Sequence, residues 1–290
     1  MLEGRIIKGI GGLYFVDAGE KIYEANARGI FRKLKITPLV GDFVKISVIN
    51  EDKKRASIEK ILDRKNELIR PKIANIDLCI ITFAAKSPDI NFDTLDRFLI
   101  LSEKININTV ICINKADLSD EETINIINKV YAPIYDVFYT CTKTKEGVDK
   151  LLKFINKKAV VFAGPSGVGK SSLINCIAPS LTLKTGEISR KIERGKHTTR
   201  QVELIDIGKG TYAADSPGFT SLSLNGISLE KLPYYFKEFK KYLGGCRFND
   251  CLHIKEPDCM VKANIGNGIS EERYKRYICF ADEIKKGEFR

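Results

Sequence analysis

Two short motifs in the middle of the chain stand in an order that constrains the fold. Gly164-Pro165-Ser166-Gly167-Val168-Gly169-Lys170-Ser171 follows the apolar run 159–163 and precedes a helical run that begins at Ser172. A strand, a glycine-rich loop and a helix in this order are the context that a phosphate-binding loop requires. Asn114-Lys115-Ala116-Asp117 follows another apolar run, 109–113, and precedes the phosphate loop. A nucleotide-binding α/β domain that carries both motifs ordinarily begins with its phosphate loop. The sequence therefore predicts an α/β domain whose parts are permuted along the chain.

The phosphate loop carries its own chemistry. Its glycines let consecutive backbone N–H groups point at phosphate oxygens, and the following helix adds its positive dipole end. We expect Lys170 to reach the β- and γ-phosphates and the Ser171 hydroxyl to bind Mg²⁺. The predicted nucleotide contacts are Gly164, Pro165, Ser166, Gly167, Val168, Gly169, Lys170, Ser171 and Ser172. The loop is also similar to that of guanylate kinases, so a nucleotide kinase stays open as an alternative.

The earlier motif names the base. Asp117 can accept two hydrogen bonds from the N1–H and N2 amino groups of guanine, whereas adenine offers no such pair of donors. Asn114, Lys115 and Ala116 stand with it at the carboxyl end of a buried strand, where open α/β sheets bind their ligands. The motif therefore predicts GTP and GDP as ligands.

Two further segments follow the phosphate loop. Asp215-Ser216-Pro217-Gly218 comes after the apolar run 211–214 and offers a carboxylate to Mg²⁺ and a glycine N–H to a γ-phosphate. Thr198 and Thr199 lie in a basic segment, 184–200, and either hydroxyl can complete the Mg²⁺ shell when GTP orders that segment.

The residue patterns on either side predict two more domains. Residues 1–65 alternate apolar and polar positions in five runs (5–8, 13–17, 22–27, 43–49 and 56–61), which predict a small β-barrel of the OB type. From residue 76, apolar strands (76–83, 109–113, 134–139, 159–163) alternate with helices (92–103, 121–131, 148–156), which predicts a parallel sheet covered by helices. We expect domains at 1–68 (barrel), 69–224 (permuted GTPase domain) and 225–290 (helical, ending in a helix over 270–285).

Four of the metal-ligating side chains cluster near the C-terminus. Cys246, Cys251, His253 and Cys259 supply three thiolates and one imidazole, a common structural zinc set that leaves no open position for a catalytic water. The other interpretation is a set of buried thiols beside an unrelated surface histidine. Cys79, Cys112, Cys176 and Cys279 lie among apolar residues, and we expect all four in the core.

The charge balance favours a polyanionic partner. The 290-residue chain has 48 Lys and Arg against 37 Asp and Glu, a net charge of +11. This excess attracts nucleic acid through counterion release, although a basic, solvated surface is the other interpretation. No apolar run is long enough to span a bilayer and the N-terminus lacks a signal segment, so we expect a cytoplasmic protein without membrane contact.

Together, these motifs resemble those of the circularly permuted GTPases. With the barrel and the cysteine cluster, the chain is similar to the bacterial ribosome small subunit-dependent GTPase A family. Arg70-Pro71-x-Ile73-Ala74-Asn75-Ile76-Asp77 resembles that family's entry into the GTPase domain, and the zinc spacing matches its metal motif. Cys141-Thr142-Lys143 is similar to its second guanine-contacting loop, with Cys-Thr in place of the commoner Ser-Ala.

The resemblance implies GTP hydrolysis stimulated by the small ribosomal subunit, late in that subunit's maturation, with ribosomal RNA bound and one Zn²⁺ per chain. We expect a monomer away from the ribosome. Phe219 stands where a Ras-type switch places its water-orienting Gln, so we hypothesise that His197 positions the water once the ribosome orders its segment. The predicted catalytic set is His197, Lys170, Thr198, Thr199, Asp215 and Gly218. A ribosomal-RNA-binding module with a degenerate nucleotide site is a further alternative.

Overall fold

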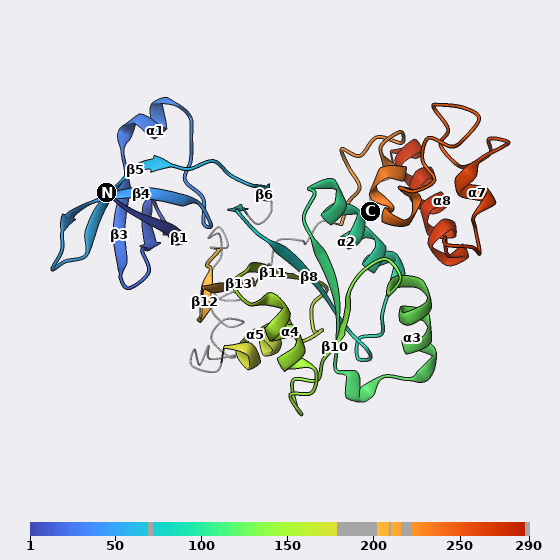
Figure 1. Ribbon diagram of the computed structural model, residues 1–290, viewed down its shortest axis with the longest axis horizontal. Coiled ribbons are helices and arrows are strands. Elements are labelled where there is room, and N and C mark those ends of the chain that lie inside the picture. Colours follow the sequence, from blue (N-terminus) through green and yellow to red (C-terminus); the bar gives the residue numbers. More distant parts are fainter. Residues whose placement is uncertain (69–71, 179–201, 209, 216–221, 288–290) are drawn as a thin grey trace. The chain divides into compact units, whose positions relative to one another are not determined.

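The computed structural model describes residues 1–68, 72–178, 202–208, 210–215 and 222–287 (Figure 1). The chain forms two compact units. The first comprises residues 1–79, 148–163 and 170–219, and the second comprises residues 80–147, 164–169 and 220–290. Each unit is built from segments far apart in the sequence.

A closed five-stranded barrel begins the first unit, as the alternating pattern predicts; it is the blue part of the chain in Figure 1. Its strands are β1 (Leu2–Ile10), β2 (Leu13–Asp17), β3 (Ile22–Ala27), β4 (Phe43–Asn50) and β5 (Arg55–Ile61), and α1 (Gly29–Lys33) lies between β3 and β4. The strand order is β1-β2-β3-β5-β4, with β3 and β5 parallel and the other neighbours antiparallel. Buried and exposed residues alternate along β3 and β5, which places one side of each strand in the barrel core.

The remainder of the first unit supplies strands and helices of the predicted GTPase domain. These are α4 (Val148–Ile155), β11 (Ala159–Ala163), α5 (Lys170–Ile177), β12 (Ile205–Gly208) and β13 (Thr211–Asp215), preceded by the short pair β6 (Glu67–Leu68) and β7 (Ile73–Ala74). β11 and β13 run parallel, and β12 pairs antiparallel with β13. β12 was not predicted, and it departs from the expected all-parallel sheet.

Contacts within this unit tie the barrel to β13. The Tyr212 hydroxyl donates to Asp17 Oδ2 at 2.7 Å, and the Arg5 guanidinium lies 5.2 Å from the centre of the Tyr212 ring. Arg5 Nη2 also donates to the Asn75 carbonyl at 2.5 Å. The backbone N–H of Leu204 donates to the carbonyl of Ile7, so the chain beyond residue 201 continues along β1.

The second unit holds the other strands and helices of the predicted GTPase domain. They are β8 (Leu78–Ala84), which begins at the unit boundary, α2 (Phe92–Lys104), β9 (Thr109–Asn114), the turn η1 (Ala116–Leu118), α3 (Glu121–Ile126), the π-helical turn η2 (Ile127–Tyr131) and β10 (Val137–Tyr139). β9 and β10 are parallel. The helix expected over 121–131 is therefore present, with its second half in the π-helical form, and the strand expected over 134–139 is confined to its second half.

The C-terminal part of this unit is mostly irregular. It contains η3 (Leu232–Tyr235), η4 (Lys237–Phe239), α7 (Met260–Ala263) and α8 (Glu271–Lys286), which share an apolar core around Phe236, Phe239, Tyr277 and Phe280. α2 packs against η3 and α8. Cys279 on α8 is exposed, so its expected place in the core is wrong. Of the helices in the described residues, none combines the length and the apolar character needed to cross a membrane.

A buried network of ion pairs joins residues of α8 to Asp96 of α2 and Glu238 of η4. The Arg273 side chain is fully buried and donates to both carboxylate oxygens of Glu238, at 2.7 and 3.0 Å, and to Asp96 Oδ1 at 2.5 Å. Arg276 Nε donates to the other Asp96 oxygen, and the Tyr131 hydroxyl donates to Oδ1. Burial alone would lower the pKa of Arg273, but the two carboxylates raise it well above its usual value, so the guanidinium stays charged.

Candidate nucleotide site and metal cluster

The predicted guanine loop is a sharp turn at the carboxyl end of β9. Asn114 ends the strand and is fully buried, Lys115 adopts the left-handed conformation with φ 56°, and Ala116 begins the turn η1. The Ala116 N–H donates to the Thr140 carbonyl at 3.0 Å. Asp117 is exposed, so its carboxylate is accessible to a base.

Glycine is required at two positions of the phosphate loop. Gly164 has φ 142°, and a Cβ there would lie 2.0 Å from the Thr82 carbonyl oxygen. Gly169 has φ 92°, and a Cβ there would lie 2.4 Å from Asn114 Nδ2. Neither separation is sterically possible, and positive φ also disfavours a side chain. The two glycines are thus required by the protein's own packing.

The two predicted nucleotide loops interlock within the second unit. Asn114 Nδ2 donates to the Val168 carbonyl at 3.0 Å, and Lys115 Nζ donates to the Gly167 carbonyl at 3.0 Å. Lys115 Nζ also donates to the Ser87 carbonyl. Val168 itself is buried, whereas Ser166 and Gly167 beside it are exposed. These bonds fix the predicted guanine loop against the predicted phosphate loop.

Two residues at the end of β10 support the guanine loop, and only one was predicted. Thr140 Oγ1, which is fully buried, donates to Asn114 Oδ1 at 3.3 Å, and Cys141 Sγ donates to Asp117 Oδ1 at 3.1 Å. Cys112 Sγ lies 3.4 Å from Thr140 Oγ1. Burial raises the pKa of Cys112 to about 12, so this side chain remains a neutral thiol. The sequence indicates the Cys141 loop by resemblance. Thr140 was missed, although its place at a strand's carboxyl end next to that loop is a usable signal.

The first unit carries the remaining predicted nucleotide residues that the structure describes. Lys170 is the first residue of α5, and Ser171 and Ser172 follow on its exposed first turn. β11 and β13 are in parallel register with Phe162 opposite Asp215, so both strands end at the same edge of their sheet. His197, Thr198, Thr199 and Gly218 lie outside the described residues.

The four predicted metal ligands come together in the C-terminal part of the second unit. The Sγ atoms of Cys246, Cys251 and Cys259 and a ring nitrogen of His253 all lie within 4.8 Å of one another. His253 Nδ1 is 3.3 Å from Cys259 Sγ and 3.5 Å from Cys246 Sγ. This separation is what four donors around one tetrahedral ion require.

The surroundings of the cluster also fit a metal. Backbone N–H groups of Met260 and Lys262 point at the sulfurs of Cys246 and Cys259, at 3.3 and 3.5 Å, and such donors stabilise thiolates. Burial lowers the pKa of His253, which keeps its imidazole neutral and able to ligate. The same burial raises the pKa of Cys251 to about 12, so a thiolate there needs a cation beside it. The donor set fits zinc, and it is not explained by buried thiols near an unrelated surface histidine.

Comparison with known proteins decides the family. A family model described as RsgA GTPase matches residues 61–225, more than half of the chain, and a model of the RsgA N-terminal domain matches residues 3–56. The chain belongs to the RsgA GTPase family. Its membership confirms the predicted family, the permuted P-loop fold and GTP hydrolysis as the activity, and it implies a guanine nucleotide with Mg²⁺.

Similarity to RsgA proteins extends over the whole chain. Proteins named small ribosomal subunit biogenesis GTPase RsgA include one from Alkaliphilus metalliredigens strain QYMF, 46% identical over 99% of each chain. Another, from Geobacillus sp. strain WCH70, is 47% identical over 99% of this chain and 98% of its own. Among solved structures, YjeQ from Thermotoga maritima superposes with a TM-score of 0.86 at 35% identity, covering 98% of each chain. YloQ, described as a circularly permuted GTPase, gives 0.82 at 40% identity over 100% of this chain and 97% of that one.

Proposed function

We propose that this RsgA-family GTPase hydrolyses GTP on the small ribosomal subunit, late in the maturation of that subunit, and binds its ribosomal RNA. The observation that carries the nucleotide part is the pair of bonds from Asn114 and Lys115 to the carbonyls of Val168 and Gly167. They join a base-reading loop to a phosphate loop in advance of any ligand. The partner follows from the names of the relatives and from the net charge of +11.

The proposal assigns roles at the base, the phosphates and the magnesium ion. Asp117 accepts from the guanine edge, with Cys141 as a neighbour that orients its carboxylate. The backbone N–H groups of the loop 164–169 and the Lys170 ammonium hold the phosphates. Mg²⁺, when bound, neutralises the charge that develops on the phosphates, and Ser171, Asp215 and one of Thr198 and Thr199 are its proposed ligands. His197 positions the water and the Gly218 N–H contacts the γ-phosphate.

The proposal also covers the division of the chain and its surroundings. Residues 1–68 form an RNA-binding OB barrel, 69–224 the permuted GTPase domain and 225–290 a domain held by one Zn²⁺. The chain works in the cytoplasm and is monomeric away from the ribosome. The two rival interpretations are less well supported: family membership argues against a guanylate kinase, and the intact geometry of Gly164 and Gly169 argues against a degenerate nucleotide site.

The deciding experiment measures GTP hydrolysis by the purified chain alone, with small subunits, and with large subunits as a control. We expect slow turnover alone, because a site completed by the ribosome cannot stabilise transition-state charge in advance. Selective stimulation by small subunits supports the proposal. Equal turnover in all three reactions would sink it.

Variants test the residue roles. Asp117→Asn should lose guanine-nucleotide affinity at least tenfold, because one carboxylate accepts two base donors. Glu122→Gln, an exposed neighbour with the same change of charge, should bind normally. His197→Ala should lose stimulated turnover with nucleotide affinity intact, and unchanged stimulation would remove that role.

A further inference from the structure

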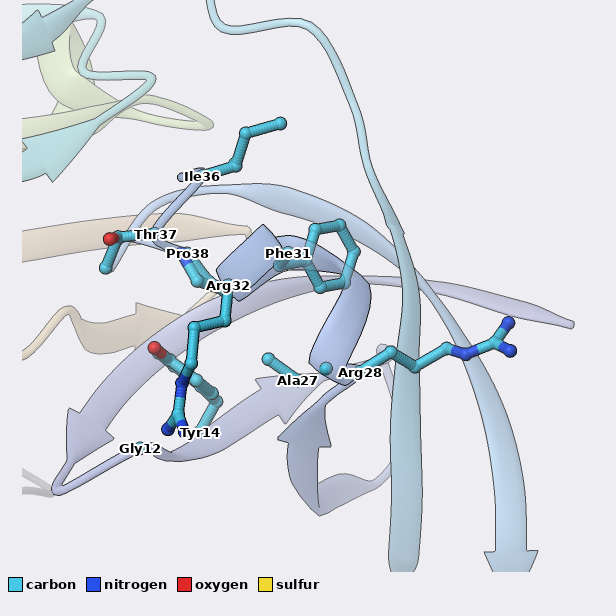
Figure 2. Close-up of a pocket in the computed structure, with 10 residues that line it drawn as sticks. Gly12, Tyr14, Ala27, Arg28, Phe31, Arg32, Ile36, Thr37 and Pro38 are labelled. Carbon is cyan, nitrogen blue, oxygen red and sulfur yellow. The ribbon is translucent and has the colours of Figure 1, made fainter. Parts of the chain in front are cut away.

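A pocket on the barrel is lined by none of the predicted nucleotide-binding residues. It has a volume of about 410 Å³ and lies where the hairpin turn at Gly12, strands β2 and β3 and helix α1 meet (Figure 2). The volume is at the lower end of the range of about 300–1,000 Å³ that small-molecule sites occupy. In OB barrels the face of strands 2 and 3 and the loop between strands 1 and 2 carry oligonucleotides, and this pocket includes parts of both.

One wall of the pocket is aromatic and is held in place. Tyr14 on β2 stands opposite Gly9 on β1, and a Cβ at Gly9 would lie 3.3 Å from the Tyr14 ring. The glycine therefore lets the ring lie close over the neighbouring strand. Phe31 of α1 also lines the pocket and is buried. A fixed, half-exposed tyrosine ring offers a surface for a flat apolar group.

The charge of the pocket is positive. Arg28 and Arg32 line it, and its lining includes no acidic residue. Arg28 is engaged by Glu59 at 2.7 Å and points away from Tyr14 in Figure 2. Figure 2 shows Arg32 extending toward Gly12 and Tyr14. Among the described residues, no ion pair joins Arg32 to a carboxylate. The segment 25–41 contains Arg28, Arg32, Lys33 and Lys35 and no Asp or Glu.

We propose that this pocket holds one unstacked nucleotide of single-stranded RNA, with the base on Tyr14 and the phosphate at Arg32. A nucleotide combines the two features that the lining selects, a flat aromatic group and an anion within reach of it. Aromatic stacking beside a cation is the general means by which proteins hold single strands, and it does not need a particular base. The inference rests on the proposed function, because it specifies how the barrel contacts ribosomal RNA.

The test compares binding of two RNAs by the full chain with zinc bound, in the absence of ribosomes and GTP. One is an unstructured ten-nucleotide oligoribonucleotide and the other is a closed hairpin of the same composition. Tyr14→Ala should weaken binding of the unstructured RNA about tenfold or more, whereas binding of the hairpin changes little. Tyr14→Phe, which keeps the ring, should bind within about twofold of the parent.

Matched variants separate the pocket from general charge. Arg32→Gln should remove the preference for the unstructured RNA. Lys33→Gln makes the same charge change on an exposed neighbour outside the pocket, and it should weaken both RNAs alike with a salt slope lower by about one. If Tyr14→Ala does not fold, 4-thiouridine cross-linking of the parent chain replaces it, with the cross-link expected on the peptide that contains Tyr14. Binding by Arg32→Gln equal to that by Lys33→Gln, or a cross-link only elsewhere, would overturn the proposal.

Two further arms identify the source of the nucleotide and separate this proposal from the proposed function. AMP is the free-nucleotide probe, and AMP binding as tight as that of the oligoribonucleotide would overturn the assignment to RNA. A parent chain that binds RNA through Tyr14 but is not stimulated by small subunits contradicts the proposed function alone. A stimulated parent whose Tyr14→Ala variant binds the unstructured RNA normally contradicts the pocket alone.

Discussion

The barrel and the C-terminal region, residues 222–287, are both small, and they are stabilised in different ways. The barrel closes on itself, so its five strands satisfy one another's backbone groups around a continuous apolar interior. The C-terminal region has one long helix, α8, and otherwise short turns around four metal-ligating side chains and a buried ion network. Small cores commonly need such additional links. Stability is thus spread over many similar contacts in the barrel and concentrated in a few in the C-terminal region.

Removal of metal should give the largest difference between the two regions. Binding of a structural zinc by a small domain contributes on the order of 10 kcal/mol, because the site does not exist in the unfolded chain. We expect a strong chelator to remove about one zinc per chain and to abolish hydrogen-exchange protection in peptides from 246–287, while barrel peptides from 2–61 keep theirs. Metal analysis and peptide-resolved hydrogen exchange measure both quantities.

Two cysteine variants control that experiment. Cys259→Ser should bind no zinc, whereas Cys279→Ser, an exposed thiol in the same region, should bind it fully. Equal loss of protection in the barrel and the C-terminal region would contradict the contrast, as would full zinc occupancy in Cys259→Ser.

The ion network should give the next largest effect. Arg273→Ala leaves the buried carboxylates of Asp96 and Glu238 without their main partner, and such a change destabilises by about 3–5 kcal/mol. Lys275→Ala, two residues along α8 and 65% exposed at its side chain, should change stability by less than about 0.5 kcal/mol. Urea unfolding followed by near-ultraviolet circular dichroism measures the difference, and similar midpoints for the two variants would show that the network is dispensable.

The same contrast explains what the sequence could and could not predict. The barrel strands follow from a local pattern of alternation, and the zinc ligands follow from residue type and spacing. The ion network could not be predicted from the sequence, because Asp96 and Arg273 lie far apart in it. Each is on a helix whose charged residues look solvent-facing. Only the packing of α2 against α8 brings them together. The prediction that Cys279 is buried was wrong for a related reason, because its apolar neighbours in the sequence do not indicate which side of α8 faces the core.

The nucleotide site shows the same limit on a smaller scale. Asn114 and the phosphate loop were predicted because their backbone and base chemistry restricts the residue types. Thr140 was not, because its position at a strand end is a weaker signal: a threonine there satisfies many structural roles, and its bond to Asn114 distinguishes this one. The close fit of Gly169 against Asn114 is likewise a tertiary contact that no motif encodes.

In the barrel, single changes should have small effects. Ile46 on β4 is fully buried, and Ile46→Val removes one methylene group for about 0.5–1.5 kcal/mol. Ile49→Val makes the same change on the same strand at a residue that is 71% exposed, and it should be nearly neutral. Exchange of barrel amides under native conditions measures both. A larger loss for Ile46→Val than for Arg273→Ala would reverse the comparison.

The smallest expected effect is a surface ion pair across two barrel strands. Glu3 on β1 stands directly opposite Lys45 on β4, and Lys45 Nζ lies 3.2 Å from Glu3 Oε1. The Glu3 side chain is 66% exposed and the Lys45 side chain is 40% exposed. Solvent screening limits such a pair to less than about 1 kcal/mol. A double-mutant cycle with Glu3→Gln and Lys45→Met should give a coupling below this limit that fades as salt is raised. A coupling of several kcal/mol that persists in high salt would mean that the barrel, like the C-terminal region, depends on individual charge pairs.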